Sequence, residues 1–270
     1  MRRSLSGVVF LLAFLLSLTV VPGATSEPPR TPEEIEAFMR SARITAVRDV
    51  SKGVTRPLRL TLSDGTFSHD AVFQAVEQRK PLMQGANGQS EVNFVDSWRY
   101  NVAAYRLAGL LGLEGMMPVT VEYRYKSKPG ALAWWMDSLM DEGERLKKRV
   151  QPPVPAAWNE DMLRMRVFME LVHDTDRNMG NVLISPEWRV IMLDFTRAFR
   201  LWPTIRANEL PRIDRTLLAR LDGLTEEALR AATHPHLPGS EVAAVLKRRD
   251  LIVEHFRARV QQLGEARVLY

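Results

Sequence analysis

Residues 173–194 hold the side chains with the clearest chemical potential in this chain. The stretch 173–184 carries two acids, two amides and an arginine, and it leads directly into an apolar run. A second apolar run, 190–193, ends in Asp194. We expect two short strands here, joined by a turn at Pro186, which bring both polar ends to one edge. Carboxylate and amide oxygens at such an edge are suited to hold Mg²⁺ and a phosphate.

The same residues also have an ordinary structural explanation. Asp, Asn and Gly are common turn formers, so a connection between a helix and a strand can contain them for backbone reasons alone. That explanation suits any one of these residues taken singly. It suits Asp176, Asn181 and Asp194 less well as a set, because together they flank the two expected strands, and we therefore interpret them as a site. Asp174 is a second candidate acid, placed slightly earlier in the chain.

The segment from Asp176 to Asn181 resembles the catalytic loop of the protein-kinase superfamily, with its D-x-x-x-x-N spacing. With Arg177 after the acid, it is most similar to the D-R-x-x-x-N form of the phosphatidylinositol-kinase, HipA-like and Golgi secretory-kinase branches. Residues 193–196, Leu-Asp-Phe-Thr, resemble the D-F-G metal segment of the same superfamily. The resemblance covers most of the chain after its N-terminal leader and implies a bilobal α+β fold, with a small antiparallel β lobe plus one helix and a larger helical lobe.

This resemblance implies a role for each matching residue. Asp176 is expected to be the catalytic acid, while Arg177 orients the loop or contacts a phosphate. Asn181 and Asp194 are expected to bind Mg²⁺ across the phosphates of ATP. The expected reaction moves the γ-phosphate to a hydroxyl of a protein, lipid or small molecule, a task that is mostly positioning and charge neutralisation.

Two positions depart from the pattern of active kinases. The third strand of those enzymes carries a lysine that contacts the nucleotide phosphates, and here Gln74 occupies the place where we expect it. The following helix supplies a glutamate to that lysine, and here the corresponding residue is Asn101. Two amides can hydrogen-bond to each other but cannot neutralise a triphosphate. The alternative is therefore an exported pseudokinase that acts as a ligand- or partner-binding module.

A loop between the first two expected strands offers other phosphate contacts. Residues 51–55 contain Lys52 and Gly53, so backbone N–H groups and an ammonium group can face a phosphate there. Lys52 or Arg56 is then a candidate for the missing cation. A plain β-turn explains the same residues without any ligand.

Hydrophobic periodicity and breaks divide the chain into a leader, a linker and two lobes. Residues 1–26 resemble a signal peptide with cleavage near 24, since a basic start precedes a short apolar run and small residues. Residues 27–43 form a linker and a helix that starts at Thr31 and Pro32. We assign 44–150 to the small lobe, with 80–93 as a surface loop, and 151–270 to the helical lobe. The proline-rich break at 151–155 sets that boundary.

The amino-acid composition limits the class of protein and the kinds of ligand that it can bind. The 270 residues include 46% hydrophobic and 26% charged side chains, which suits a globular protein with a sizeable core. The absence of cysteine excludes disulfides and thiol chemistry. The net charge of +5 permits anionic ligands, but no basic-aromatic pattern indicates nucleic acid.

The leader predicts a periplasmic or secreted protein, or one held at the membrane only by an uncleaved N-terminal anchor. Extracytoplasmic compartments of bacteria are poor in ATP, which weighs against the kinase hypothesis. A metal-dependent hydrolase using Asp174, Asp176 and Asp194 is a third hypothesis.

Overall fold

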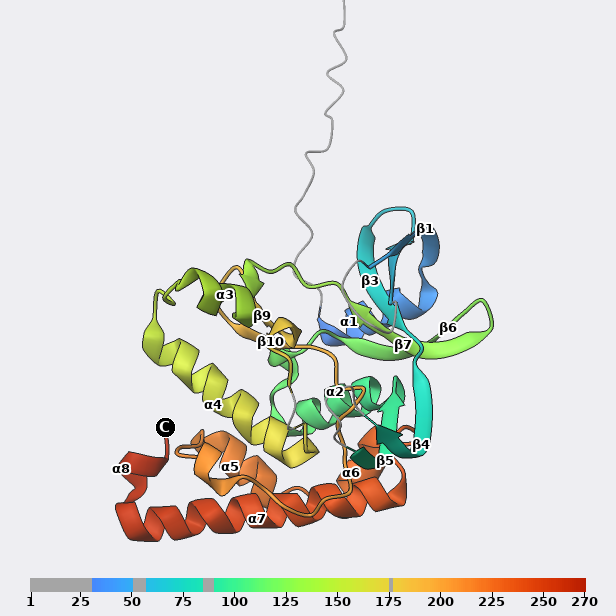
Figure 1. The fold of residues 1–270 in the computed structure, drawn as a ribbon. Coiled ribbons are helices and arrows are strands. Elements are labelled where there is room, and N and C mark those ends of the chain that lie inside the picture. The colour runs from blue at the N-terminus through green and yellow to red at the C-terminus, as the bar shows by residue number, and fades with distance from the viewer. Residues whose placement is uncertain (1–30, 51–56, 85–89, 175–176) are drawn as a thin grey trace, which may run out of the picture.

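The computed structural model describes residues 31–50, 57–84, 90–174 and 177–270. A lobe built on β-strands lies beside a larger helical lobe, and the longest helix, α7, runs along the far side of the helical lobe (Figure 1). The expected bilobal α+β fold is confirmed.

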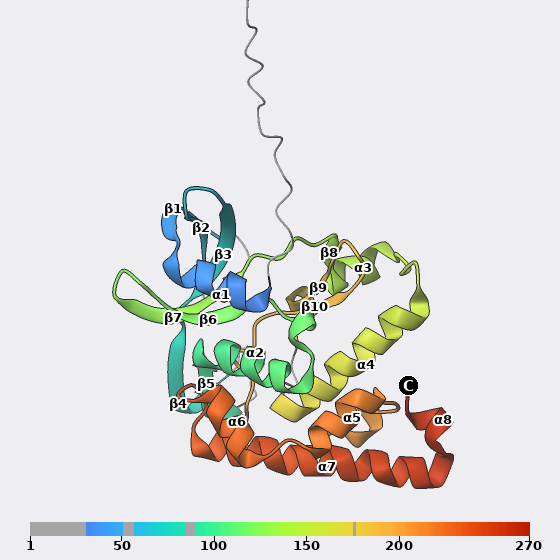
Figure 2. The same ribbon diagram turned by 180° about the vertical axis from the view of Figure 1, so that it is seen from behind.

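The small lobe is organised around an antiparallel five-stranded sheet with the order β1-β2-β3-β7-β6. Its strands are β1 (Arg43–Asp49), β2 (Leu58–Ser63), β3 (Ser68–Gln74), β6 (Thr120–Tyr125) and β7 (Lys128–Trp134). Helix α1 (Pro32–Ser41) packs on this sheet through Phe38 and Met39 (Figure 2). Thr31 and Glu34 form the capping box that starts α1, so the helix begins where Thr31 and Pro32 predict.

Helix α2 (Arg99–Leu111) joins the two lobes. It contacts β6 and β7 of the small lobe and α5 and α6 of the large lobe. Most of its side chains are buried, so packing against the two lobes stabilises this helix more than its intrinsic helix propensity does. Gly112 ends the helix in the left-handed conformation at φ 69°. The hydroxyl of Tyr100, in the first turn, donates a 3.0 Å hydrogen bond to Glu241 of the large lobe.

The prediction of a surface loop at 80–93 is wrong, because a second small sheet occupies most of this region. Strands β4 (Glu77–Gln84) and β5 (Ser90–Ser97) pair in antiparallel register, and residues 85–89 between them lie outside the described residues. Most side chains of this hairpin are exposed on both faces. The hydrophobic alternation that predicts a half-buried strand is therefore missing from the sequence. Figures 1 and 2 both place the hairpin beside α2 and α6.

The large lobe surrounds helices α4 and α7. Its helices and short strands are β8 (Met140–Asp141), α3 (Glu142–Lys148), α4 (Pro155–Val172), β9 (Val182–Ile184), β10 (Val190–Met192), α5 (Arg215–Asp222), α6 (Glu226–Thr233), α7 (Gly239–Leu263) and α8 (Glu265–Val268). Short 3-10 turns are η1 (Glu114–Met116), η2 (Met179–Asn181) and η3 (Ala207–Glu209).

Arg248 on α7 is a fully buried cation that fixes the chain beyond the candidate site. Its guanidinium donates to the carbonyl of Leu171 at 2.7 Å and to those of Arg200 and Trp202 at 2.8 Å. Burial lowers the pKa of Arg248 to about 10, so the group stays protonated at neutral pH. These bonds attach residues 200–202 to the end of α4.

The segment just before the boundary expected at residue 151 packs on the helical part of the chain. Strand β8 pairs with β9 of the large lobe, and α3 packs on η2. Residues 140–148 therefore pack with the large lobe. Pro155 instead begins α4, because proline suits the first helical position.

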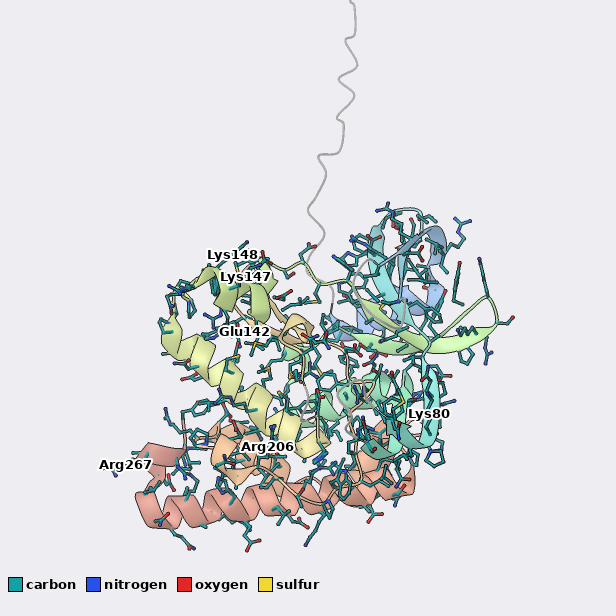
Figure 3. All side chains as sticks on the ribbon, viewed as in Figure 1. Lys80, Glu142, Lys147, Lys148, Arg206 and Arg267 are labelled. Atoms are coloured by element: carbon teal, nitrogen blue, oxygen red, sulfur yellow. The ribbon has the colours of Figure 1, made fainter. Side chains whose placement is uncertain are left out.

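The charged run in α3 lies mainly on a solvated face, as its spacing predicts. Lys148 pairs with Glu144 at 2.5 Å, and both side chains are largely exposed. Glu142 instead is buried and pairs with Arg145 at 2.6 Å. Figure 3 shows Lys147 and Lys148 at the outer end of α3 and Glu142 nearer the body of the lobe.

Within the described ranges, which exclude residues 1–30, no helix is both long enough and apolar enough to cross a membrane. The signal peptide expected at 1–26 lies outside these ranges.

Candidate active site at the lobe junction

The hairpin of β9 and β10 positions the candidate metal-binding residues. Val190 pairs with Ile184 and Met192 with Val182, and all four side chains are buried. The pairing continues past Met192, where the Leu193 N–H donates to the Asn181 carbonyl at 2.9 Å. Asn181 and Asp194 therefore sit at the same end of this hairpin, as the two apolar runs predict.

Arg177 holds this end together. Its Nη1 donates to the Leu193 carbonyl at 2.6 Å and to the Asn181 carbonyl at 3.2 Å. Its Nη2 pairs with the carboxylate of Asp174, and its guanidinium lies 4.2 Å from the ring centre of Phe195. The side chain is only 3% exposed. Of its two expected roles, the geometry therefore favours orienting the loop over contacting a phosphate.

Asp174 is occupied by this contact. Its carboxylate is buried and bound to Arg177, so it supports the loop and is poorly placed to activate a water molecule. This weakens the hydrolase hypothesis, which needs Asp174 at the reacting centre. Asp176, the expected catalytic acid, lies outside the described residues.

Asp194 has an unusual backbone conformation for an aspartate. Its φ of 53° is in the left-handed region, which costs a residue with a Cβ about 1 kcal/mol or more. The side chain is exposed, and its Oδ1 accepts a 3.0 Å hydrogen bond from the hydroxyl of Thr196. A carboxylate held out of the core in this way is available to a cation.

Gln74 and Asn101 meet across the small lobe. The Nδ2 of Asn101 donates to the Oε1 of Gln74 at 2.7 Å, so the two amides form the hydrogen bond that their positions allow. The Oδ1 of Asn101 accepts from the backbone N–H of Phe195 at 2.6 Å. The pair therefore also reaches the segment that follows Asp194, a contact that the sequence did not predict.

Asp96 is a further acid beside this segment that the sequence interpretation missed. Burial raises the pKa of Asp96 most, a hydrogen bond with the Thr196 side chain lowers it, and the nearby Asp194 carboxylate raises it again. Asp96 belongs to β5, so the missing strand pattern of the hairpin also concealed this acid.

The β4–β5 hairpin contacts residues 196–200, which follow Asp194 and Phe195. The Ser97 N–H donates to the Thr196 carbonyl at 2.8 Å. Glu91 pairs with Arg197 at 2.8 Å and also with Arg200. Both guanidinium groups lie over the ring of Phe94, at 5.2 and 5.6 Å. These contacts order residues 196–200 against the small lobe.

Replacing Glu91 with glutamine is therefore expected to loosen residues 196–200 without unfolding the protein. The two ion pairs are partly exposed, so their joint loss costs about 0.5–1 kcal/mol. We expect the amides of 196–200 to exchange with solvent about two- to fivefold faster. Hydrogen exchange measures this, with exposed Glu254 changed to glutamine as the control. Equal protection in both variants would show that the ion pairs do not hold the segment.

The phosphate contacts predicted in the loop 51–56 lie outside the described residues. Lys52, Gly53 and Arg56 belong to 51–56, which the structure does not describe. Among the residues it describes, no group of three or more His, Cys, Asp or Glu side chains is placed to bind a metal ion. The expected ligand set needs fewer acids, because it combines the Asn181 amide with the Asp194 carboxylate.

Comparisons with known proteins extend this picture. No family model matches the chain, and no curated protein matches it in sequence. Solved structures do match. A hydra Fam20 structure with sugar has a TM-score of 0.64 at 16% identity, over 88% of this chain and 91% of that one. The Golgi casein kinase with Mn and ADP bound has a TM-score of 0.61 at 15% identity, over 88% and 78%.

A third structure, the Helicobacter pylori proinflammatory kinase CtkA, has a TM-score of 0.52 at 12% identity, over 84% and 98% of the two chains. The chain has the fold of the atypical protein kinases. In this kinase-like fold, Asn181 lies directly before β9 and Asp194 follows β10, while α2 brings Asn101 to the segment after Asp194. At identities this low the likeness concerns the fold, and function rests on the site.

Proposed function

We propose that this kinase-like protein is a phosphotransferase that moves the γ-phosphate of ATP to a hydroxyl acceptor with the help of Mg²⁺. The observation that carries the proposal is the arrangement around Arg177. Its guanidinium binds the carbonyls of Asn181 and Leu193, which places the Asn181 amide and the Asp194 carboxylate at one edge. Both supply the hard oxygen ligands that Mg²⁺ prefers.

In the proposed mechanism each residue has a limited task. Bound Mg²⁺ would neutralise charge on the phosphates of ATP. Asn181 and Asp194 would hold the metal, and Asp176, by its spacing from Asn181, would accept the proton of the attacking hydroxyl. Arg177 would be a positioning residue, because its buried guanidinium is bound to the carbonyls of Asn181 and Leu193 and to the carboxylate of Asp174. The Golgi casein kinase with Mn and ADP bound supports nucleotide and metal as the ligands to test.

A second candidate, a pseudokinase that binds a ligand or partner, is favoured by one specific contact. The amide of Asn101 hydrogen-bonds Gln74 where active kinases have an ion pair, so neither side chain brings a positive charge to a triphosphate. We further propose, from residues 1–24, that the protein is exported. An exported chain meets little ATP, which also favours this candidate. Lys52 and Gly53 are the proposed phosphate contacts that would favour the enzyme.

Occupancy of the site by nucleotide is tested by thermal unfolding. Mg²⁺ and ATP at about a hundredfold excess over Kd are expected to raise the unfolding temperature by roughly 5–10 °C, because only the folded chain binds them. AMP with Mg²⁺ is the control, since it lacks the phosphates that the metal bridges. An unchanged unfolding temperature at millimolar ATP would contradict nucleotide binding and, with it, the proposed phosphotransferase.

A further inference from the structure

Asn101 stands at a junction between the small lobe and the metal segment. It lies in the first turn of α2, and its side chain bonds to β3 through Gln74 and to the backbone of Phe195. The adjoining Ser97 N–H bonds to the carbonyl of Thr196. Two consecutive residues after Asp194 are therefore attached to the short stretch 97–101.

That stretch is itself fixed at both ends. The Trp98 N–H donates to the Val76 carbonyl at 2.8 Å, which attaches the start of α2 to the chain beyond β3. The ring of Trp98 is 1% exposed. On the other side, the ring of Phe195 is buried between Phe168 and Arg177. The hydrogen bonds to 195 and 196 therefore connect two well-packed parts of the chain, with the left-handed Asp194 immediately next to them.

The direction of the hydrogen bonds in this junction follows from chemistry. The N–H of Phe195 can only donate, so Asn101 must present its carbonyl oxygen there. Its amide nitrogen then faces Gln74, which must in turn present an oxygen. The order of donors and acceptors is thus set from the metal segment outward to β3, and the residue at 74 must be an acceptor.

We infer that Gln74 and Asn101 form a positioning pair, in which the acceptor at 74 fixes the amide of Asn101 so that it holds the backbone of the metal segment. This inference rests on the proposed function only for the use of that segment. It also predicts that restoring the lysine that active kinases carry at this position would harm the site. Lysine at 74 alone would disturb the segment and would not repair the site, because a lysine ammonium would face the amide N–H₂ of Asn101, a donor against a donor.

The pair can be tested by exchanging its chemistry in steps. Gln74→Lys forces Asn101 either to face a donor or to turn its oxygen away from Phe195. Asn101→Asp keeps an acceptor for the Phe195 N–H, and the Gln74 amide can turn to donate its N–H₂ to the other aspartate oxygen. The double variant restores a matched contact, with lysine donating to aspartate while the other aspartate oxygen accepts from Phe195. Gln74→Glu also retains an acceptor at 74, and Gln261→Lys adds the same charge at an exposed site on α7.

The measurement is hydrogen exchange of the Phe195 amide without nucleotide, with the amide of buried Phe256 in α7 as the reference for global unfolding. Relative to Phe256, Gln74→Lys is expected to speed exchange at Phe195 about tenfold, the factor equivalent to one hydrogen bond of about 1.4 kcal/mol. Adding Asn101→Asp to it should return exchange to within about twofold of wild type. Gln74→Glu, Gln261→Lys and Asn101→Asp alone should leave Phe195 protected.

The opposite pattern overturns the inference. Unchanged protection of Phe195 in Gln74→Lys, or no recovery in the double variant, would show that residue 74 does not act through Asn101. If Gln74→Lys does not fold, Gln74→Met decides the matter, because it removes the acceptor at 74 without adding a charge and is also expected to speed exchange at Phe195. Because no nucleotide is present, the outcome is separate from whether ATP binds, and a correct pair is compatible with either proposed function.

Discussion

Replacement of Arg177 with leucine is expected to lower the free energy of unfolding by about 3–5 kcal/mol, because it removes one partner of a buried ion pair. The guanidinium is 3% exposed and satisfies Asp174 and the carbonyls of Asn181 and Leu193. Leucine keeps part of the packing against Phe195 but supplies no donor. The buried carboxylate of Asp174 would then lack its cation, which is far more costly than the loss of a surface pair.

Denaturant unfolding of matched variants measures this effect. Arg166 lies on α4 with an exposed side chain, so Arg166→Leu should change the free energy of unfolding by no more than about 0.5 kcal/mol. Adding Asp174→Asn to Arg177→Leu should recover part of the loss, since a neutral amide tolerates burial better than a carboxylate. Equal stability of the Arg177 and Arg166 variants would mean that Arg177 does not support the loop.

The second large effect concerns Asp194. The expected metal ligands are the Asn181 amide and the Asp194 carboxylate, and Asp194→Ala removes that carboxylate. Phosphate transfer is then expected to fall about a thousandfold, which is equivalent to roughly 4 kcal/mol of transition-state stabilisation. The fold should be retained, because this side chain is exposed. Transfer from γ-labelled ATP measures the loss, with exposed Asp222→Ala on α5 as the control.

We also expect the Asp194→Ala variant to keep its folded structure. Alanine at 194 keeps the backbone contacts of its neighbours, Leu193 and Phe195, while it loses the bond to the Thr196 hydroxyl. A variant that folds and still transfers phosphate at the wild-type rate would show that the metal assignment is wrong.

Much of the fold was predictable because its signals are local. Thr31 and Pro32 predict the start of α1, and Gly112 predicts the end of α2. Buried strands and helices such as β2 and α2 have the apolar patterns that their positions in the core require. The spacing from Asp176 to Asn181 and the position of Asp194 likewise depend on short stretches, and the hairpin of β9 and β10 brings Asn181 and Asp194 to one end as expected.

What was not predictable depends on partners distant in sequence. Most side chains of the β4–β5 hairpin are exposed, and part of its link to the large lobe is the pairing of Glu91 with Arg197 and Arg200. The pairing of β8 with β9, across the boundary expected at residue 151, was also not predictable, because a strand of two residues has no recognisable pattern. The burial of Arg177 is similar, since no local pattern shows that its guanidinium faces Leu193 and Phe195.

Labelled phosphate transfer tests the central claim most directly. The chain would be incubated with Mg²⁺, γ-labelled ATP and a panel of hydroxyl acceptors that includes a serine peptide, inositol and a hexose. The proposed function predicts label on an acceptor or on the chain itself with the wild type, and its loss with Asp194→Ala. ATP that binds the wild-type chain and stays intact throughout would contradict the phosphotransferase and leave the ligand-binding pseudokinase.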